Sequence, residues 1–131
     1  MKIQYTVTLT LLVGVAIGAI ALQGLRAQAG PAVYVITLID ASNPDGYSKE
    51  YSPKAAASIK AAGGHRVAAG GLGGGKITAL EGSPPMRAVV NQFDSLEKAE
   101  AWRNSDAYKE ARMIGDNYAK FKAFAIEGVS Q

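Results

Sequence analysis

The stretch AVYVITLID, residues 32–40, is nearly all apolar and rich in β-branched and aromatic side chains. This composition predicts a β-strand. Side chains of a strand point alternately to the two faces of its sheet, and here both the odd and the even positions are apolar. The pattern therefore predicts a strand whose sheet is covered on both faces.

A helix is expected directly after this strand. Asn43 is suited to cap a helix whose first residue is Pro44. Pro53 lies inside the helical pattern, so we expect the helix to kink there or to restart after Ser52. Gly63 and Gly64 then end it. Apolar residues recur along this segment as on one helix face: Tyr47, Tyr51, Ala55, Ile59 and Ala62.

The remaining pattern predicts four more strands and a second helical region. Short strands are expected over 65–69 and 76–81, a strong strand over 86–93 and a closing strand over 120–129. Asp94 and Glu97 form a variant of the capping box that opens a helix, and Ser105 offers a second cap. If the strand over 76–81 is merged with its neighbour, the order becomes βαββαβ. This order predicts an α+β protein with a ferredoxin-like fold and an antiparallel sheet.

A ferredoxin-like fold places both helical regions on one face of the sheet. The chain has no further segment to cover the other face, although AVYVITLID is apolar on both sides. We therefore expect a homodimer in which sheet packs against sheet, a dimeric α/β barrel. The alternative is a monomer with an exposed apolar face, which soluble proteins rarely tolerate.

The first 29 residues have the order of a secretory signal peptide. Met1 and Lys2 give a positive start, residues 7–22 carry no charge, and Ala27-Gln28-Ala29 is a small-x-small site. Cleavage after Ala29 would leave one domain over 30–131, exported to the periplasm or secreted. The alternative is an uncleaved membrane anchor, although sixteen uncharged residues fall short of the roughly 20 that a spanning helix needs.

Charge and cysteine content narrow the class of protein. Without residues 1–29 the chain keeps 12 basic and 11 acidic residues, so no basic patch for nucleic acid is indicated. The 131-residue chain has no cysteine, which excludes disulfides, a thiol nucleophile and thiolate metal ligands. One histidine and no clustered carboxylates indicate no metal site.

Several motifs resemble a known family. They are LEG at 80–82, FDSLEKAEAW at 93–102 and SDAYKEA at 105–111, and the likeness extends over residues 32–129. The domain is similar to the small family catalogued as domain of unknown function thirteen-thirty, in the dimeric α/β-barrel superfamily. The resemblance implies the ferredoxin-like fold and a dimer, and it brings no established activity. The superfamily includes cofactor-free monooxygenases, haem-degrading enzymes and isomerases, but a shared fold does not establish function.

Two positions depart from the family pattern. Members commonly carry an arginine where this chain has Ala69 and an acidic residue where it has Gln92. If the two positions are neighbours in the sheet, this chain has lost both charges of a pair together. That loss is milder than the loss of one charge, because no charge remains buried alone.

Seven side chains are candidates for a ligand site. His65 is the weak candidate for a catalytic group or haem ligand, but no acidic partner is identifiable by spacing, and a surface position at the strand end is the alternative. The aromatic candidates are suited either to line a pocket or to form ordinary core. Asn91 and Gln92 must point to opposite faces of their strand, and each needs partners if buried. The full set is Tyr34, Tyr47, Tyr51, His65, Asn91, Gln92 and Trp102.

The glycine-rich stretch AAGGLGGGKIT, residues 68–78, resembles part of a phosphate-binding P-loop. A P-loop needs a following helix and a Ser or Thr directly after its lysine, and here Ile77 follows Lys76. We therefore expect Gly70 to Gly75 to form a mobile hairpin connection at the barrel rim.

Three functional hypotheses follow. The first is an exported dimer without a cofactor that binds a small, partly apolar molecule or serves as a structural module. The second is a cofactor-independent monooxygenase or isomerase in which His65, Tyr51 and Asn91 orient or deprotonate a substrate. The third is haem binding through His65.

Overall fold

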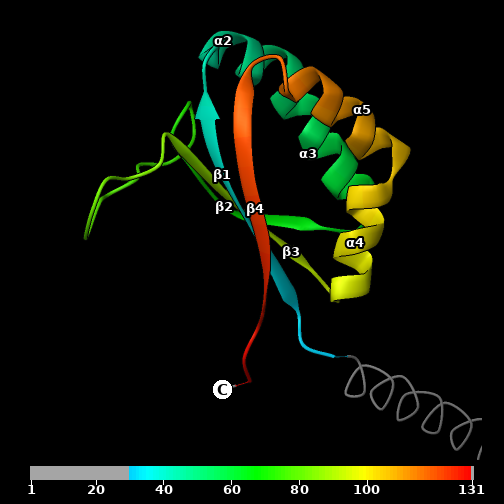
Figure 1. The fold of residues 1–131 in the computed structure, drawn as a ribbon. Helices are drawn as coiled ribbons and strands as arrows, with labels where there is room; N and C mark the ends of the chain where they lie inside the picture. The colour runs from blue at the N-terminus through cyan, green and yellow to red at the C-terminus, as the bar shows by residue number, and fades with distance from the viewer. Residues whose placement is uncertain (1–29, 131) are drawn as a thin grey trace, which may run out of the picture. The chain divides into compact units, whose positions relative to one another are not determined.

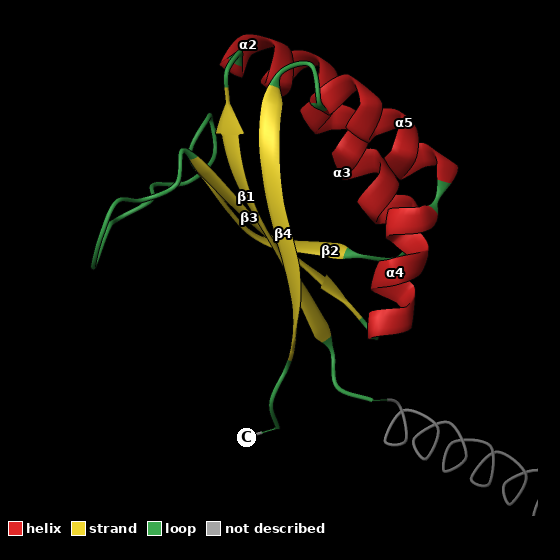
Figure 2. Cartoon of the chain, viewed as in Figure 1, coloured by secondary structure: helices red, strands yellow, loops and turns green. Residues whose placement is uncertain are grey.

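The computed structural model describes residues 30–130. The elements in chain order are β1 (Val33–Ala41), α2 (Pro44–Gly46), η1 (Tyr47–Tyr51), α3 (Ser52–Ala61), β2 (His65–Gly70), β3 (Arg87–Phe93), α4 (Leu96–Asn104), α5 (Asp106–Gly115) and β4 (Ala119–Glu127). The four strands form one antiparallel sheet in the order β2-β3-β1-β4. The helices lie together on one side of this sheet (Figures 1 and 2). The predicted α+β class and ferredoxin-like arrangement are confirmed.

Strand β1 lies in the middle of the sheet, between β3 and β4. Val33, Val35 and Ile39 are buried beneath the helices. The alternating residues Tyr34, Ile36 and Leu38 lie on the opposite face, which we call the outer face, and are only half-buried. Nothing in residues 30–130 forms a second layer over that face.

The first helical region begins and breaks where the sequence indicated. The Asn43 side chain accepts a hydrogen bond from the Gly46 backbone N–H at 3.0 Å, and Pro44 is the first helical residue. One wide π-helical turn, η1, precedes Pro53, and α3 restarts at Ser52. Proline lacks a backbone donor, so it is tolerated in the first turn of the restarted helix, where no donor is needed.

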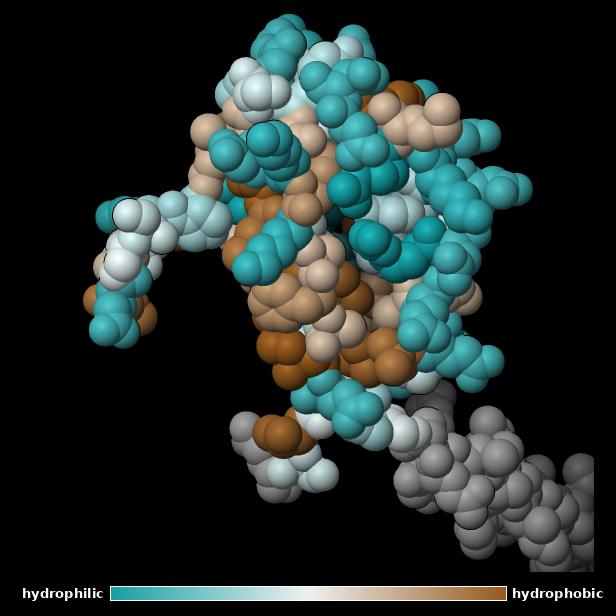
Figure 3. All heavy atoms as spheres, in the orientation of Figure 1, coloured by the Kyte–Doolittle hydropathy of each residue, from teal (hydrophilic) through white to brown (hydrophobic). Residues whose placement is uncertain are grey.

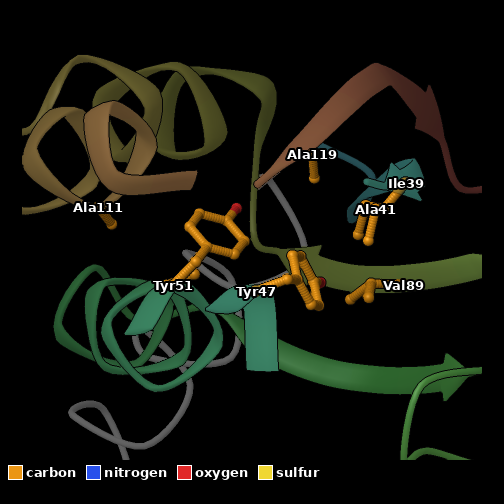
Figure 4. Packing of buried hydrophobic residues seen from close by; sticks show 8 residues of the cluster. Ile39, Ala41, Tyr47, Tyr51, Val89, Ala111 and Ala119 are labelled. Carbon is orange, nitrogen blue, oxygen red and sulfur yellow. The ribbon is translucent and has the colours of Figure 1, made fainter. Parts of the chain in front are cut away.

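Two clusters of buried side chains join the helices to the sheet. The first contains Tyr47 and Tyr51, which lie next to each other between η1 and the strands in Figure 4, together with Ile39, Ala41, Ala55, Val89, Ala111 and Ala119. The second surrounds the stacked rings of Phe93 and Trp102, whose centroids are 5.3 Å apart. Its other members are Val33, Val35, Ile59, Ala99 and Tyr108.

Two local predictions are wrong. Residues 76–81 form no strand but part of a long connection between β2 and β3, which projects from the sheet in Figure 1. No neighbouring strand pairs with this segment, and an unpaired segment gains none of the ladder hydrogen bonds that stabilise a strand. Helix α4 is capped by Ser95, whose Oγ accepts from Lys98 N–H at 3.2 Å, and not by Asp94. Asp94 instead pairs with the Lys98 side chain.

The second predicted cap is confirmed, because Ser105 Oγ accepts a hydrogen bond from Tyr108 N–H at 3.2 Å. The predicted signal peptide over 1–29 lies outside the described residues. Among residues 30–130, no helix has the length and apolar character to cross a membrane.

Candidate functional site

The structure divides the seven candidate residues between the two faces of the sheet. Four of them surround a small cavity between the sheet and the helices, which we call the inner cavity: Tyr47, Tyr51, Asn91 and Trp102. Tyr34 and Gln92 lie on the outer face, and His65 is exposed at the start of β2. The candidates therefore do not form one site.

The inner cavity has a volume of about 20 Å³, which is room for about one water molecule. Sequence patterns missed several of its polar lining residues, namely Thr37, Ser52, Arg66 and Tyr108. Its apolar lining comes from Ile39, Ala55, Ile59 and Val89. In this structure the cavity accepts a single small group, and a larger ligand requires a lining side chain to move.

Asn91 is a buried polar residue of the inner cavity with one side-chain atom that lacks a hydrogen-bond partner. It lies on β3, is only 3 % exposed, and its Oδ1 is the one buried side-chain polar atom among residues 30–130 without a hydrogen-bond partner. The prediction that Asn91 and Gln92 face opposite sides is confirmed. A buried acceptor without a partner costs about 1–3 kcal/mol, so a hydrogen-bond donor that enters the cavity is favoured at this atom.

Tyr47 and Tyr51, on the cavity wall, stay neutral at ordinary pH. The Tyr47 and Tyr51 rings lie 5.2 Å apart. Burial raises the pKa of Tyr51 well above its usual value, and burial also raises that of Tyr47 against the lowering effect of Arg87. Their hydroxyls are therefore suited to hydrogen bonding and not to removing a proton from a substrate.

The polar side-chain atom of Trp102, Nε1, already has a hydrogen-bond partner. Its Nε1 donates to Ser58 Oγ at 3.0 Å, and Ser58 Oγ donates to the Ala55 carbonyl at 2.7 Å. With Phe93 stacked on the indole, Trp102 forms a rigid apolar wall. It gives the cavity shape and does not supply a donor to a ligand.

Two arginines that the sequence did not single out lie close to the cavity. Arg87 is 5 % exposed, and its Nε donates to the Tyr47 hydroxyl at 3.1 Å. Arg66 lines the cavity itself. Neither guanidinium is among the ion pairs found within residues 30–130. Burial, together with the positive charge of Arg87, lowers the pKa of Arg66. Within residues 30–130, the cavity therefore has two arginines beside it that form no ion pair with a carboxylate.

The glycine-rich stretch folds against Arg87 and not around a phosphate. Arg87 Nη1 donates to the Gly71 carbonyl, and Gly71 N–H donates to the Gly75 carbonyl at 2.9 Å. The chain has positive φ at Gly71 and Gly73, as expected of a glycine connection. No helix follows this turn before β3, so the P-loop interpretation is excluded by the structure.

The two positions that depart from the family pattern are not neighbours. Ala69 pairs with Val89 and packs into the helix-side core, whereas Gln92 pairs with His65 on the outer face. The hypothesis of a lost charge pair between Ala69 and Gln92 is therefore wrong. The antiparallel register places His65 opposite Gln92 and Ala69 opposite Val89, three residues away along β3, and an irregularity between Arg66 and Ala68 turns Ala69 to the helix side.

The outer face and the end of β4 leave apolar side chains in solvent. Phe124 is 42 % exposed and Ile126 is 48 % exposed. Ala123 and Ala125, on the opposite side of the same strand, are exposed as well. Figure 3 shows hydrophobic atoms gathered over the region through which β4 descends. Side chains on both faces of this end of β4 are therefore exposed within residues 30–130.

His65 contributes to a separate surface groove of about 470 Å³. The groove is lined by Ala56, Ile59, Lys60, Gly63, Gly64, His65 and Arg66. His65 lies outside the inner cavity, and no group of three or more His, Asp or Glu side chains within residues 30–130 is placed to hold a metal.

The element order, the sheet order and the single helix layer define a protein of the ferredoxin-like class. The family model for Domain of unknown function (DUF1330) matches residues 32–129. The chain belongs to this family, which confirms the resemblance of its motifs.

Solved structures show the same fold at low sequence identity. A protein of unknown function from Rhodopseudomonas palustris is similar with a TM-score of 0.61 and 13 % identity, over 85 % of this chain and 93 % of that one. A provisionally named antibiotic biosynthesis monooxygenase from Caulobacter crescentus is similar with a TM-score of 0.53 and 13 % identity, over 78 % and 93 %. No curated protein matched this chain. At this identity the likeness concerns the fold alone.

Proposed function

We propose that this protein is an exported homodimer in which the outer faces of two sheets pack against each other. The observation that carries the proposal is the apolar outer face of β1 and β4. Ile36 and Leu38 are only half-buried, and Phe124 and Ile126 are among the most exposed large apolar side chains of the sheet. A second copy offers the same surface and would cover it about a two-fold axis.

The long connection between β2 and β3 supports the same arrangement. It leaves the sheet on the side away from the helices in Figure 1. Leu80 in this connection is 97 % exposed. In a dimer packed through the outer faces, such an arm lies alongside the partner and has apolar surface to bury there.

Light scattering on the protein as recovered from producing cells tests the dimer. Phe124→Lys places a charge in the proposed interface, and we expect it to produce monomers at micromolar protein. Met113→Lys is the matched control, because Met113 is 74 % exposed on α5, in the helix layer, and is expected to leave the dimer intact. A monomeric wild-type protein, or a Phe124→Lys variant as dimeric as Met113→Lys, contradicts the proposal.

Export is tested by the mass of the recovered protein. Removal of residues 1–29 predicts a chain that begins at Gly30. A mass that includes residues 1–29, with the protein held in the membrane fraction, would show an anchor in place of a cleaved signal peptide.

Binding of a small, partly apolar molecule at the inner cavity is a second function that one observation favours. Asn91 Oδ1 is buried without a donor in a cavity walled by aromatic rings. Phenol is a simple probe, because it supplies a ring and one hydroxyl donor. We expect phenol to shift the NMR signals of the Asn91 side-chain amide and the Trp102 indole N–H. Shifts confined to exposed residues would count against the cavity as a binding site.

The enzymatic and haem hypotheses gain no support from the geometry. Haem binding was expected through His65, which is exposed and absent from the inner cavity. The enzymatic hypothesis combined His65 with Tyr51 and Asn91, and only the latter two line the inner cavity, whose volume of about 20 Å³ leaves no room for a substrate. We therefore propose neither of them.

A further inference from the structure

The inner cavity and the surface groove are adjoining spaces. Only Ile59 and Arg66 line both of them. Ile59 is a buried core residue, whereas Arg66 is exposed, on an edge strand of the sheet. A long, exposed arginine changes rotamer at low cost, and a buried isoleucine does not. Arg66 is therefore the side chain whose movement joins the two spaces.

The lining of the joined space carries positive charge and no carboxylate. Its charged side chains are Lys60 and Arg66, and neither the groove nor the cavity is lined by Asp or Glu. The carboxylates that form ion pairs within residues 30–130 are Asp45, Asp94 and Asp116, each with a partner four residues away along the chain. A ligand of this space is therefore expected to bring its own negative charge.

The inner end of the space needs a hydrogen-bond donor. Asn91 Oδ1 has no partner, and Arg66 and Asn91 are directly paired across β2 and β3. Paired residues on one face have Cβ atoms about 5 Å apart, so one small ligand can contact both side chains. The inner cavity is large enough for a hydroxyl group but not for a ring.

We propose that this joined space binds a small hydroxycarboxylate. Its hydroxyl group enters the inner cavity and donates to Asn91 Oδ1. Its apolar body lies against Ile59 in the groove, and its carboxylate pairs with Arg66, which turns outward to admit it. This assignment rests on the proposed small-molecule function and adds the chemical class of the ligand.

Three related probes separate the two polar contacts. 4-Hydroxybenzoate has both groups, 4-hydroxybenzamide lacks the charge, and benzoate lacks the hydroxyl donor. We expect 4-hydroxybenzoate to bind most tightly to the wild-type protein, by NMR titration of the Trp102 indole N–H. A charge-assisted hydrogen bond in a sheltered site corresponds to roughly a ten- to hundredfold difference in affinity.

Variants assign each contact to its residue. Arg66→Gln should abolish the preference for 4-hydroxybenzoate over 4-hydroxybenzamide, and Asn91→Leu should abolish its preference over benzoate. Lys109→Gln is the control, because Lys109 is an exposed cation on α5 that lines neither space. It should change no affinity.

The outcomes distinguish this proposal from the function on which it rests. If 4-hydroxybenzoate and its amide bind equally, or Arg66→Gln behaves as the wild type, the hydroxycarboxylate assignment is overturned while small-molecule binding stands. If none of the three probes binds and phenol also fails, both are overturned.

Discussion

Alanine substitution at two glycines of the β2–β3 connection tests how tightly this turn is packed. Gly71 and Gly73 both have positive φ, at 75° and 86°. They differ in their surroundings. A Cβ at Gly71 would lie 2.0 Å from the Met86 carbonyl oxygen, whereas a Cβ at Gly73 would meet nothing within 4 Å.

The structure predicts a large difference between the two variants. Left-handed backbone costs an alanine about 1–2 kcal/mol, and both variants carry this cost. Relief of the contact at Gly71 requires the chain around Met86 to move, which also disturbs the hydrogen bond from Arg87 to the Gly71 carbonyl. A charged hydrogen bond contributes about 1.5–3 kcal/mol. We expect a loss of roughly 3–4 kcal/mol in the free energy of unfolding for Gly71→Ala and about 1 kcal/mol for Gly73→Ala.

Urea unfolding followed by tryptophan fluorescence measures these losses. Trp102 is the only tryptophan of the chain and is 3 % exposed, so its emission reports loss of the core. Because dissociation of a dimer would add to the free energy, all variants are compared at one protomer concentration. In thermal unfolding we expect Tm to fall by about 5 °C for Gly73→Ala and by about 15 °C or more for Gly71→Ala.

Equal losses for the two variants would refute this reasoning. They would show that only the backbone conformation matters and that the close approach of Gly71 to Met86 does not restrain the turn. A loss for Gly73→Ala greater than that for Gly71→Ala would contradict the packing of the whole connection.

Three further predictions concern the core. Ser58→Ala removes the acceptor of Trp102 Nε1 and should cost about 1–3 kcal/mol in urea unfolding, whereas a loss near zero would contradict this hydrogen bond. Asn91→Leu removes a buried acceptor without a partner, so it should leave the free energy of unfolding unchanged or raise it by up to about 1 kcal/mol, and a clear destabilisation would show that Oδ1 is satisfied. Burial raises the pKa of Tyr51 in the folded protein, so the folded state holds this proton more tightly and stability should fall as pH rises above the unfolded value of 10.0. Unfolding midpoints measured across alkaline pH should decline less steeply in Tyr51→Phe, and identical slopes would contradict the burial.

Local features of the fold were predictable because their signals are local. Asn43 and Pro44 mark a helix start through side-chain and backbone properties of single residues, and Pro53 marks its restart. Asp94 was mistaken for the cap of α4 because Asp and Ser are both good caps. Which of the two residues caps the helix depends on where the chain leaves β3 and α4 begins, and that point makes Ser95 the cap.

The candidate site was only partly predictable. The helical stripe correctly placed Tyr47 and Tyr51 against the sheet, and strand alternation separated Asn91 from Gln92. The sequence did not predict Arg66 as a residue of the site, because a charged residue on a short exposed strand has the pattern of a solvent-facing side chain.

The sequence by itself determined the order of the elements and the two apolar faces of β1, because alternation and capping act over a few neighbouring residues. The tertiary structure alone decided which polar groups meet. Arg66 lies opposite Asn91 because β2 pairs with β3 in one register, and Ala69 faces the helices because that register shifts between Arg66 and Ala68. A shift of one residue turns every following side chain to the other face, and the residues of HRVAAG do not specify it locally. The inner cavity with its unpaired oxygen therefore depends on long-range pairing that only the folded sheet establishes.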